Sequence, residues 1–272
     1  MAITIVGTPA QVTEAINTFS GAYHLGFNTV RNLGTQYLQT AQPIPTAVIP
    51  LARELRAVLH QWGAAEPGMP VPGAPGAPVM HDIATFEQTL SSALLHADLK
   101  FLTSLPLSRL VVTNNHRAII GPPHGVSSAT FDETLFRVLH ALAEELFEAN
   151  TNVTYPMKAV LLITGLMPAF DGQVKAGLAR AGMRGFSGTR YLMPADAQTA
   201  PGAKISRLPF LLGECWNMNV GNLSAAIQAS LFPALANQPG RVFDVLLFVQ
   251  GRGNNPIRTI EYQGKAGWYD FS

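Results

Sequence analysis

The sequence has one cysteine and few charged residues. A single cysteine cannot form an internal disulfide or a cysteine-based metal cage. Such a low cysteine content fits a protein of a reducing compartment. Charged residues make up 13% of the 272 residues, which is about half of the ~25% usual in soluble domains. The net charge is +1, without basic clusters. We therefore expect no nucleic-acid partner.

Long hydrophobic runs are also absent. A transmembrane helix needs ~20 apolar residues; the most apolar stretch, 159–170, is far shorter, and the longest uncharged stretch, 216–240, is rich in Asn and Gln. Residues 1–8 lack the basic region and apolar run of a signal peptide. The sequence thus predicts a cytoplasmic protein, and it leaves leaderless export and peripheral membrane association open.

What the sequence does contain is apolar residues, at 47%, with a mean hydropathy of +0.18. So few charges predict a large buried core, an internal apolar cavity, or an apolar face that meets lipid or a partner. The length fits one domain over 1–272. A Pro/Gly-rich loop at 66–80 separates an N-terminal helical part from the rest.

Periodicity predicts helices in the first half and strands in the second. A capping box at Thr130 and Glu133 begins the clearest helix. Other helices are expected over 8–40, 46–62, 82–105, 171–181 and 222–235, with a loop over 191–204. Strands are expected over 110–120, 157–166, 208–212, 242–250 and 257–263. The prediction is a helix-rich α/β fold, with α+β as the alternative, whose small sheet comes mainly from the C-terminal half and is covered by helices.

Cys215 is the first candidate for covalent chemistry. It follows the strand-like run 208–212 and precedes the helix expected from Asn222. A thiol between a strand end and a helix N-terminus gains stabilisation as thiolate, which is a strong nucleophile. The alternative is that Cys215 is a small hydrophobic residue of the core.

Two histidines are candidates to assist Cys215. His116 and His124 lie in predicted loops beside polar, glycine or proline residues, where catalytic residues often occur. Either could form a Cys–His pair, and the sequence does not choose between them. No HExxH motif or histidine pair at helical spacing occurs, so we expect no metal site and no separate cofactor. The segment 251–255 is glycine-rich, but it is typical of a tight hairpin turn and not of a phosphate loop.

The segment Gly213-Glu214-Cys215-Trp216, late in an apolar chain of this size, resembles the Evf virulence factor family. The resemblance implies an α/β fold and a fatty acid, palmitate in that family, held in thioester linkage on Cys215. A ~16-carbon chain gains about 0.8 kcal/mol per buried CH₂, so it would need a long apolar tunnel. The acyl donor would be a thioester such as acyl-CoA or acyl carrier protein.

Three hypotheses follow from the sequence. In the first, the protein is a virulence-factor-like carrier of an acyl chain on Cys215 and acts in lipid binding or at a host membrane. In the second, it is an acyltransferase or thioesterase with an acyl-Cys215 intermediate. In the third, it binds lipid or a partner non-covalently and Cys215 is inert.

Overall fold

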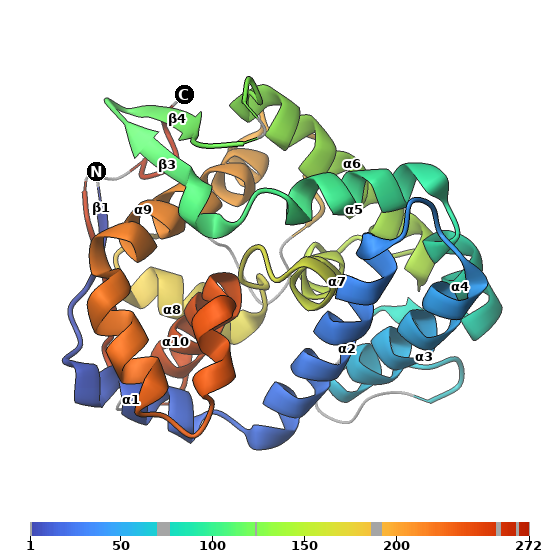
Figure 1. Cartoon of the computed structure of the whole chain (residues 1–272), viewed down its shortest axis with the longest axis horizontal. Helices are drawn as coiled ribbons and strands as arrows, with labels where there is room; N and C mark the ends of the chain where they lie inside the picture. The colour runs from blue at the N-terminus through green and yellow to red at the C-terminus, as the bar shows by residue number, and fades with distance from the viewer. Residues whose placement is uncertain are drawn as a thin grey trace.

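Helices dominate the computed structural model of the chain (Figure 1). The structure describes residues 2–69, 77–122, 124–185, 192–253, 257–264 and 267–271. Of the described residues, 62% are in helices and 10% in strands. The helix-rich α/β class predicted from the sequence is confirmed.

One group of helices surrounds α7 (Thr154–Thr164) at the centre of the molecule (Figure 1). All eleven residues of α7 are buried, and a helix that is apolar on every side belongs inside a protein. The helices of this group are α2 (Gly21–Gln39), α3 (Pro45–Gln61), α4 (Ile83–Leu90), α5 (Ala93–Thr103) and α6 (Ser128–Leu146).

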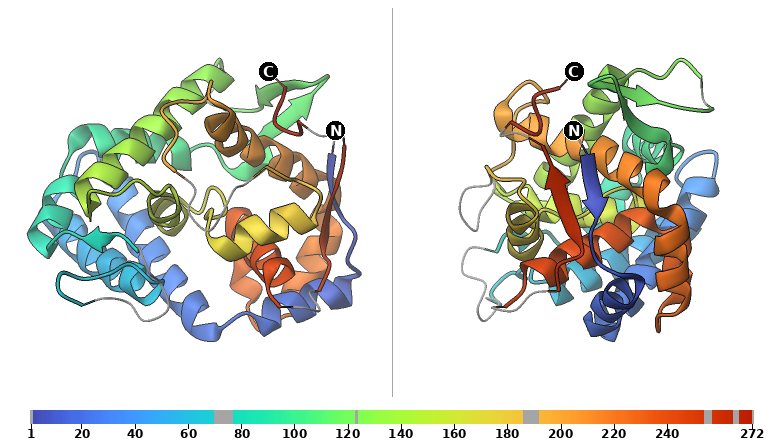
Figure 2. Two further views of the ribbon diagram at one scale, coloured as in Figure 1. Left: turned by 180° about the vertical axis from the view of Figure 1, so that it is seen from behind. Right: turned by 90° about the vertical axis from the view of Figure 1, so that its left-hand side faces the viewer.

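A second group consists of four further helices beside a terminal strand pair (Figures 1 and 2). They are α1 (Pro9–Thr18), α8 (Gly172–Arg180), α9 (Ala200–Gln228) and α10 (Pro239–Gly251). Helices α8 and α10 pack closely because glycines lie at their crossing: a Cβ added at Gly177 would overlap the Leu247 carbonyl oxygen, and one at Gly251 would overlap that of Gln173. Residues 165–171 connect α7 of the first group to α8 of the second.

The strands form three separate antiparallel pairs in the described parts of the chain, where one small C-terminal sheet was expected. The chain termini supply the first pair, β1 (Ala2–Ile5) with β6 (Ile260–Gln263), seen side by side in Figure 2. The second pair is β2 (Val79–Met80) with β5 (Phe147–Glu148), and the third is the hairpin β3 (Leu110–Thr113) with β4 (His116–Ile119). The strand expected at 257–263 is thus confirmed, but its partner is β1.

Three of the predicted strands are helical. The run 157–166 belongs to α7, the run 208–212 lies inside α9, and the run 242–250 is α10. Each of these runs is buried on all sides, so its sequence shows no polar face. A short apolar run of this kind has the same pattern in a buried strand and in a buried helix. The helix expected over 222–235 is right only for 222–228, which are the last residues of α9; Asn222 does not begin a helix, and a separate 3₁₀ turn, η2 (Pro233–Asn237), follows.

The remaining predicted helices differ from the observed helices mainly in where they begin and end. Helices α3 and α8 confirm the predictions at 46–62 and 171–181. The helix expected over 8–40 is two helices that meet at Phe19, and the one over 82–105 is also divided, into α4 and α5. Helix α6 begins earlier than expected, with Ser127 as its N-cap.

Two predicted loops are only partly loops. The loop expected over 191–204 gives way to α9 after the N-cap Thr199. The Pro/Gly-rich loop 66–80 ends in the two residues of β2, and its part at 70–76 lies outside the described residues.

Candidate functional site

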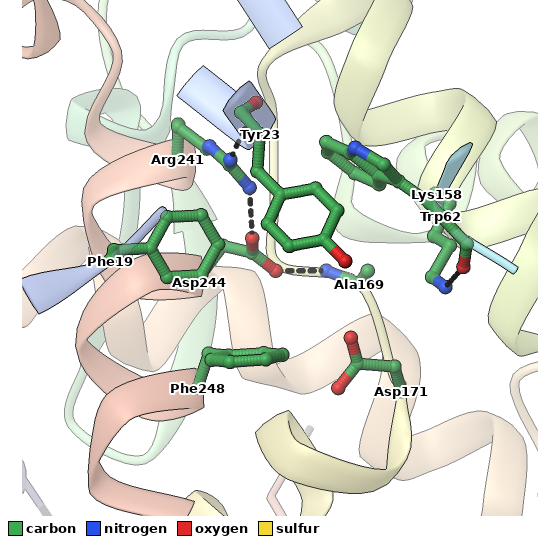
Figure 3. Close-up of a pocket in the computed structure, with 9 residues that line it drawn as sticks. All are labelled: Phe19, Tyr23, Trp62, Lys158, Ala169, Asp171, Arg241, Asp244 and Phe248. Atoms are coloured by element: carbon green, nitrogen blue, oxygen red, sulfur yellow. Dashed lines mark hydrogen bonds and ion pairs between the residues drawn. The ribbon is translucent and has the colours of Figure 1, made fainter. Parts of the chain in front are cut away.

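A cavity of about 90 Å³ lies where the two helical groups meet (Figure 3). This volume corresponds to about three water molecules at ~30 Å³ each. It lies among α1, α2, α3, α7, α10 and the segment before α8. The nine residues that line it are Phe19, Tyr23, Trp62, Lys158, Ala169, Asp171, Arg241, Asp244 and Phe248.

A buried ion pair on α10 forms one side of this cavity. Arg241 Nη1 lies 2.5 Å from Asp244 Oδ2, and the two side chains are only 1% and 6% exposed. The other carboxylate oxygen of Asp244 accepts the Ala169 N–H at 2.9 Å, and Arg241 Nη2 donates to the Tyr23 carbonyl at 3.2 Å (Figure 3). The pair therefore ties α10 to the α7–α8 connection and to the start of α2.

Aromatic rings enclose the Arg241 guanidinium. Its central carbon lies 4.9 Å from the ring centroids of Phe19 and Phe27 and 5.0 Å from that of Trp62. Such stacking suits the weakly hydrated guanidinium better than an ammonium. Burial raises the pKa of Asp244 to about 6, against the lowering effect of Arg241, so the carboxylate is still ionised at neutral pH.

Lys158 brings an amine to the cavity from the buried helix α7. Its Nζ donates to the Trp62 carbonyl at the end of α3, at 2.6 Å, and lies 4.6 Å from the centroid of the Tyr155 ring. Burial lowers the pKa of Lys158 because it disfavours the charged ammonium, while Asp171 and Asp244 act in the opposite direction. A larger fraction of neutral amine is therefore present than in an exposed lysine.

Asp171 brings a carboxylate to the same cavity. It is the N-cap of α8, where its Oδ1 accepts the backbone N–H groups of Gln173 and Val174, both at 2.9 Å. The residue is half-buried, and its side chain projects among the cavity residues (Figure 3). Capping fixes its position and leaves the second carboxylate oxygen for other partners. The cavity thus combines an amine of lowered pKa with a carboxylate held by a helix end.

Sequence reasoning missed this site, although a signal was present. Lys158 is a charged residue next to the apolar run 159–170, and Asp244 interrupts 242–250. A charge in an otherwise buried segment needs a partner, and such residues are candidates for function. Arg241 lies three residues before Asp244 on the same helix, whereas Asp171 comes from the N-terminal end of α8.

Cys215 lies in a different environment from the one predicted. It is fully buried inside α9, far from both helix ends, and not at a strand end. Its Sγ accepts from the Asn219 side chain at 3.8 Å. Burial raises the pKa of Cys215 to about 12, with Asn219 lowering it in part. The argument for a stabilised thiolate therefore does not hold in this fold.

The two candidate histidines are exposed. His116 is in β4 and His124 is in the turn that follows it, whereas Cys215 is fully buried. The structure thus does not place these imidazoles with the thiol in one buried site. Four cavities among the described residues are each lined by residues other than Cys215.

S-acylation of Cys215 stays a prediction with a direct test. The intact mass of the purified protein is measured before and after neutral hydroxylamine. An acyl thioester at this residue predicts an excess near that of a fatty acyl group, removed by hydroxylamine and absent from Cys215→Ser. An adduct of the same mass on Cys215→Ser would contradict it.

Comparisons of the chain with family models, curated proteins and solved structures found no match. The candidate site therefore rests on the geometry of this chain. Within the described residues, no helix has the length and apolarity that crossing a bilayer requires.

Proposed function

We propose that the cavity is an active site in which Lys158 acts as an amine nucleophile on the carbonyl carbon of a small aldehyde or ketone. The observation that carries the proposal is that the buried Lys158, whose amine has a pKa lowered by burial, lines a cavity that Asp171 also lines. A desolvated lysine is the side chain that enzymes use to form Schiff bases.

The reaction would proceed through a carbinolamine. The neutral Lys158 nitrogen forms a bond to the carbonyl carbon, and the Asp171 carboxylate accepts the proton that the nitrogen then loses. The oxygen takes up one proton to form the carbinolamine hydroxyl and a second as the carbon–oxygen bond breaks and water leaves. The iminium nitrogen then loses its remaining proton to Asp171, so the two protons that leave the nitrogen balance the two that leave in water. The product is an imine between Lys158 and the substrate, so each carbonyl compound bound releases one water.

The contacts of Lys158 are compatible with this role. A neutral amine can donate one hydrogen to the Trp62 carbonyl and keep its lone pair for the substrate. The small volume of the cavity favours a reacting group of a few heavy atoms. The aromatic residues Trp62 and Phe248 form part of the wall, and apolar surroundings favour the neutral amine.

The test is reductive trapping. The protein is incubated with propanal and cyanoborohydride, and the modified lysines are mapped by peptide mass spectrometry. We expect saturable labelling of Lys158 at neutral pH, faster than that of exposed lysines by about tenfold for each unit by which its pKa is lower. Lys158→Met, a change of similar volume, should lose this labelling.

Lys100→Met is the matched control. Lys100 is exposed on α5, where its Nζ donates to the Thr40 carbonyl at 3.0 Å. Its replacement should leave the labelling of Lys158 unchanged. Labelling that spreads evenly over the exposed lysines and does not saturate would refute the proposal.

A further inference from the structure

Tyr23 contributes a phenol to the cavity that contains Lys158 and Asp171. Its ring lies edge-on to that of Trp62, with centroids 6.0 Å apart, and tilted against that of Phe19 at 5.8 Å. Its backbone carbonyl accepts from Arg241. The ring is thus held by packing, and its backbone is held by the buried ion pair.

The Tyr23 hydroxyl differs from those of two other tyrosines in the core. Tyr37 donates to the Leu90 carbonyl at 2.8 Å, and Tyr155 donates to the Gly63 carbonyl at 2.6 Å. Among the residues that the structure describes, the Tyr23 hydroxyl forms no such bond. In Figure 3 it points toward the side of the cavity that carries Ala169 and Asp171. This phenol is therefore available to a bound molecule.

Imine formation needs a group of this kind. Lys158 and Asp171 account for the attack and for the proton that leaves the nitrogen, but the carbinolamine oxygen must also gain a proton before it leaves. A phenol is a hydrogen-bond donor at neutral pH, and an ionised carboxylate is not. The Arg241 Nη1 and Nη2 groups already bind Asp244 and the Tyr23 carbonyl.

We propose that Tyr23 is a catalytic residue that binds the substrate carbonyl oxygen and protonates it; this inference rests on the proposed function of Lys158. The phenol donates a hydrogen bond to the carbonyl oxygen and gives that oxygen its proton as the carbon–nitrogen bond forms; the first proton that Asp171 takes from the nitrogen restores the phenol. The phenol then gives a second proton to the carbinolamine hydroxyl as the carbon–oxygen bond breaks and water leaves. The iminium nitrogen gives its remaining proton to Asp171, which returns it to the phenolate, so the protein ends in its starting protonation state.

The experiment measures the rate of imine formation with propanal under reductive trapping, at several aldehyde concentrations. Tyr23→Phe keeps the ring and removes the hydroxyl. We expect the maximal rate at Lys158 to fall about 100-fold or more, with the half-saturating concentration changed much less. Imidazolium buffer, a small external acid, should restore part of the rate in Tyr23→Phe and have little effect on the wild type.

A second variant keeps both ring and hydroxyl. With 3,5-difluorotyrosine at Tyr23, a more acidic phenol should move the alkaline limb of the rate profile to lower pH. Equal maximal rates in wild type and Tyr23→Phe, with Lys158 still labelled, would overturn the role of Tyr23 alone. An alkaline limb that stays at the same pH in the difluorotyrosine variant would also overturn the role of Tyr23. No labelling of Lys158 in the wild type would overturn both proposals.

Discussion

Gly177→Ala is expected to lower the free energy of unfolding by about 3 kcal/mol or more. The new Cβ would overlap the Leu247 carbonyl oxygen, where α8 crosses α10. This neighbour is backbone, which cannot turn away as a flexible side chain could, so the two helices must separate. The higher helix propensity of alanine, worth up to about 1 kcal/mol, does not offset this loss.

Gly172→Ala on the same helix is the matched control. A Cβ at Gly172 would meet no atom within 4 Å, so we expect an unchanged or slightly higher stability. Urea denaturation followed by circular dichroism measures both variants. Equal free energies of unfolding for the two would show that the close crossing of α8 and α10 is not a constraint on the fold.

Asp244→Ala is expected to cost about 3–5 kcal/mol of stability, the usual cost of breaking a buried ion pair from one side. The change leaves the Arg241 charge buried without its carboxylate and the Ala169 N–H without its acceptor. Asp244→Asn keeps an acceptor for Ala169, so it should cost less. The double replacement Arg241→Met with Asp244→Leu removes both charges and should recover much of the loss.

The pH dependence of unfolding gives an independent check on Asp244. Its pKa rises from an ordinary 3.8 to about 6 in the folded protein, so between these values the folded state holds the proton more tightly than the unfolded state. The contribution of Asp244 to stability therefore decreases as the pH rises from about 4 to about 6. In Asp244→Asn the free energy of unfolding should lack this decrease. If the free energy of unfolding changed with pH in the same way in the wild type and in Asp244→Asn, the raised pKa of Asp244 would be contradicted.

The sequence predicted elements best where one face is apolar and the ends carry clear signals. Helix α8, capped by Asp171, and helix α3 are examples. It failed for α7 and α10, because a helix buried on every side has no polar face from which a 3.6-residue period can be read. The same burial led to the wrong environment for Cys215, whose setting was inferred from a strand that is not there.

The candidate site was hidden for a related reason. Lys158 could be noticed as a charge beside an apolar segment, but its significance depends on Asp171 and on the Arg241–Asp244 pair, which the fold brings to the same cavity. The close packing of α8 on α10 and the position of α7 at the centre are long-range properties. Periodicity and capping report only on neighbours along the chain.

The Arg241–Asp244 pair also restricts the motion of the two helical groups relative to each other. It holds Tyr23 at the start of α2 and Ala169 in the α7–α8 connection, which are two of the places where the chain passes from one helical group to the other. A hinge opening of the two groups would have to break both hydrogen bonds at buried positions. We therefore expect molecules to enter the cavity through rotation of half-buried lining side chains such as Trp62 and Phe248, without a separation of the two groups.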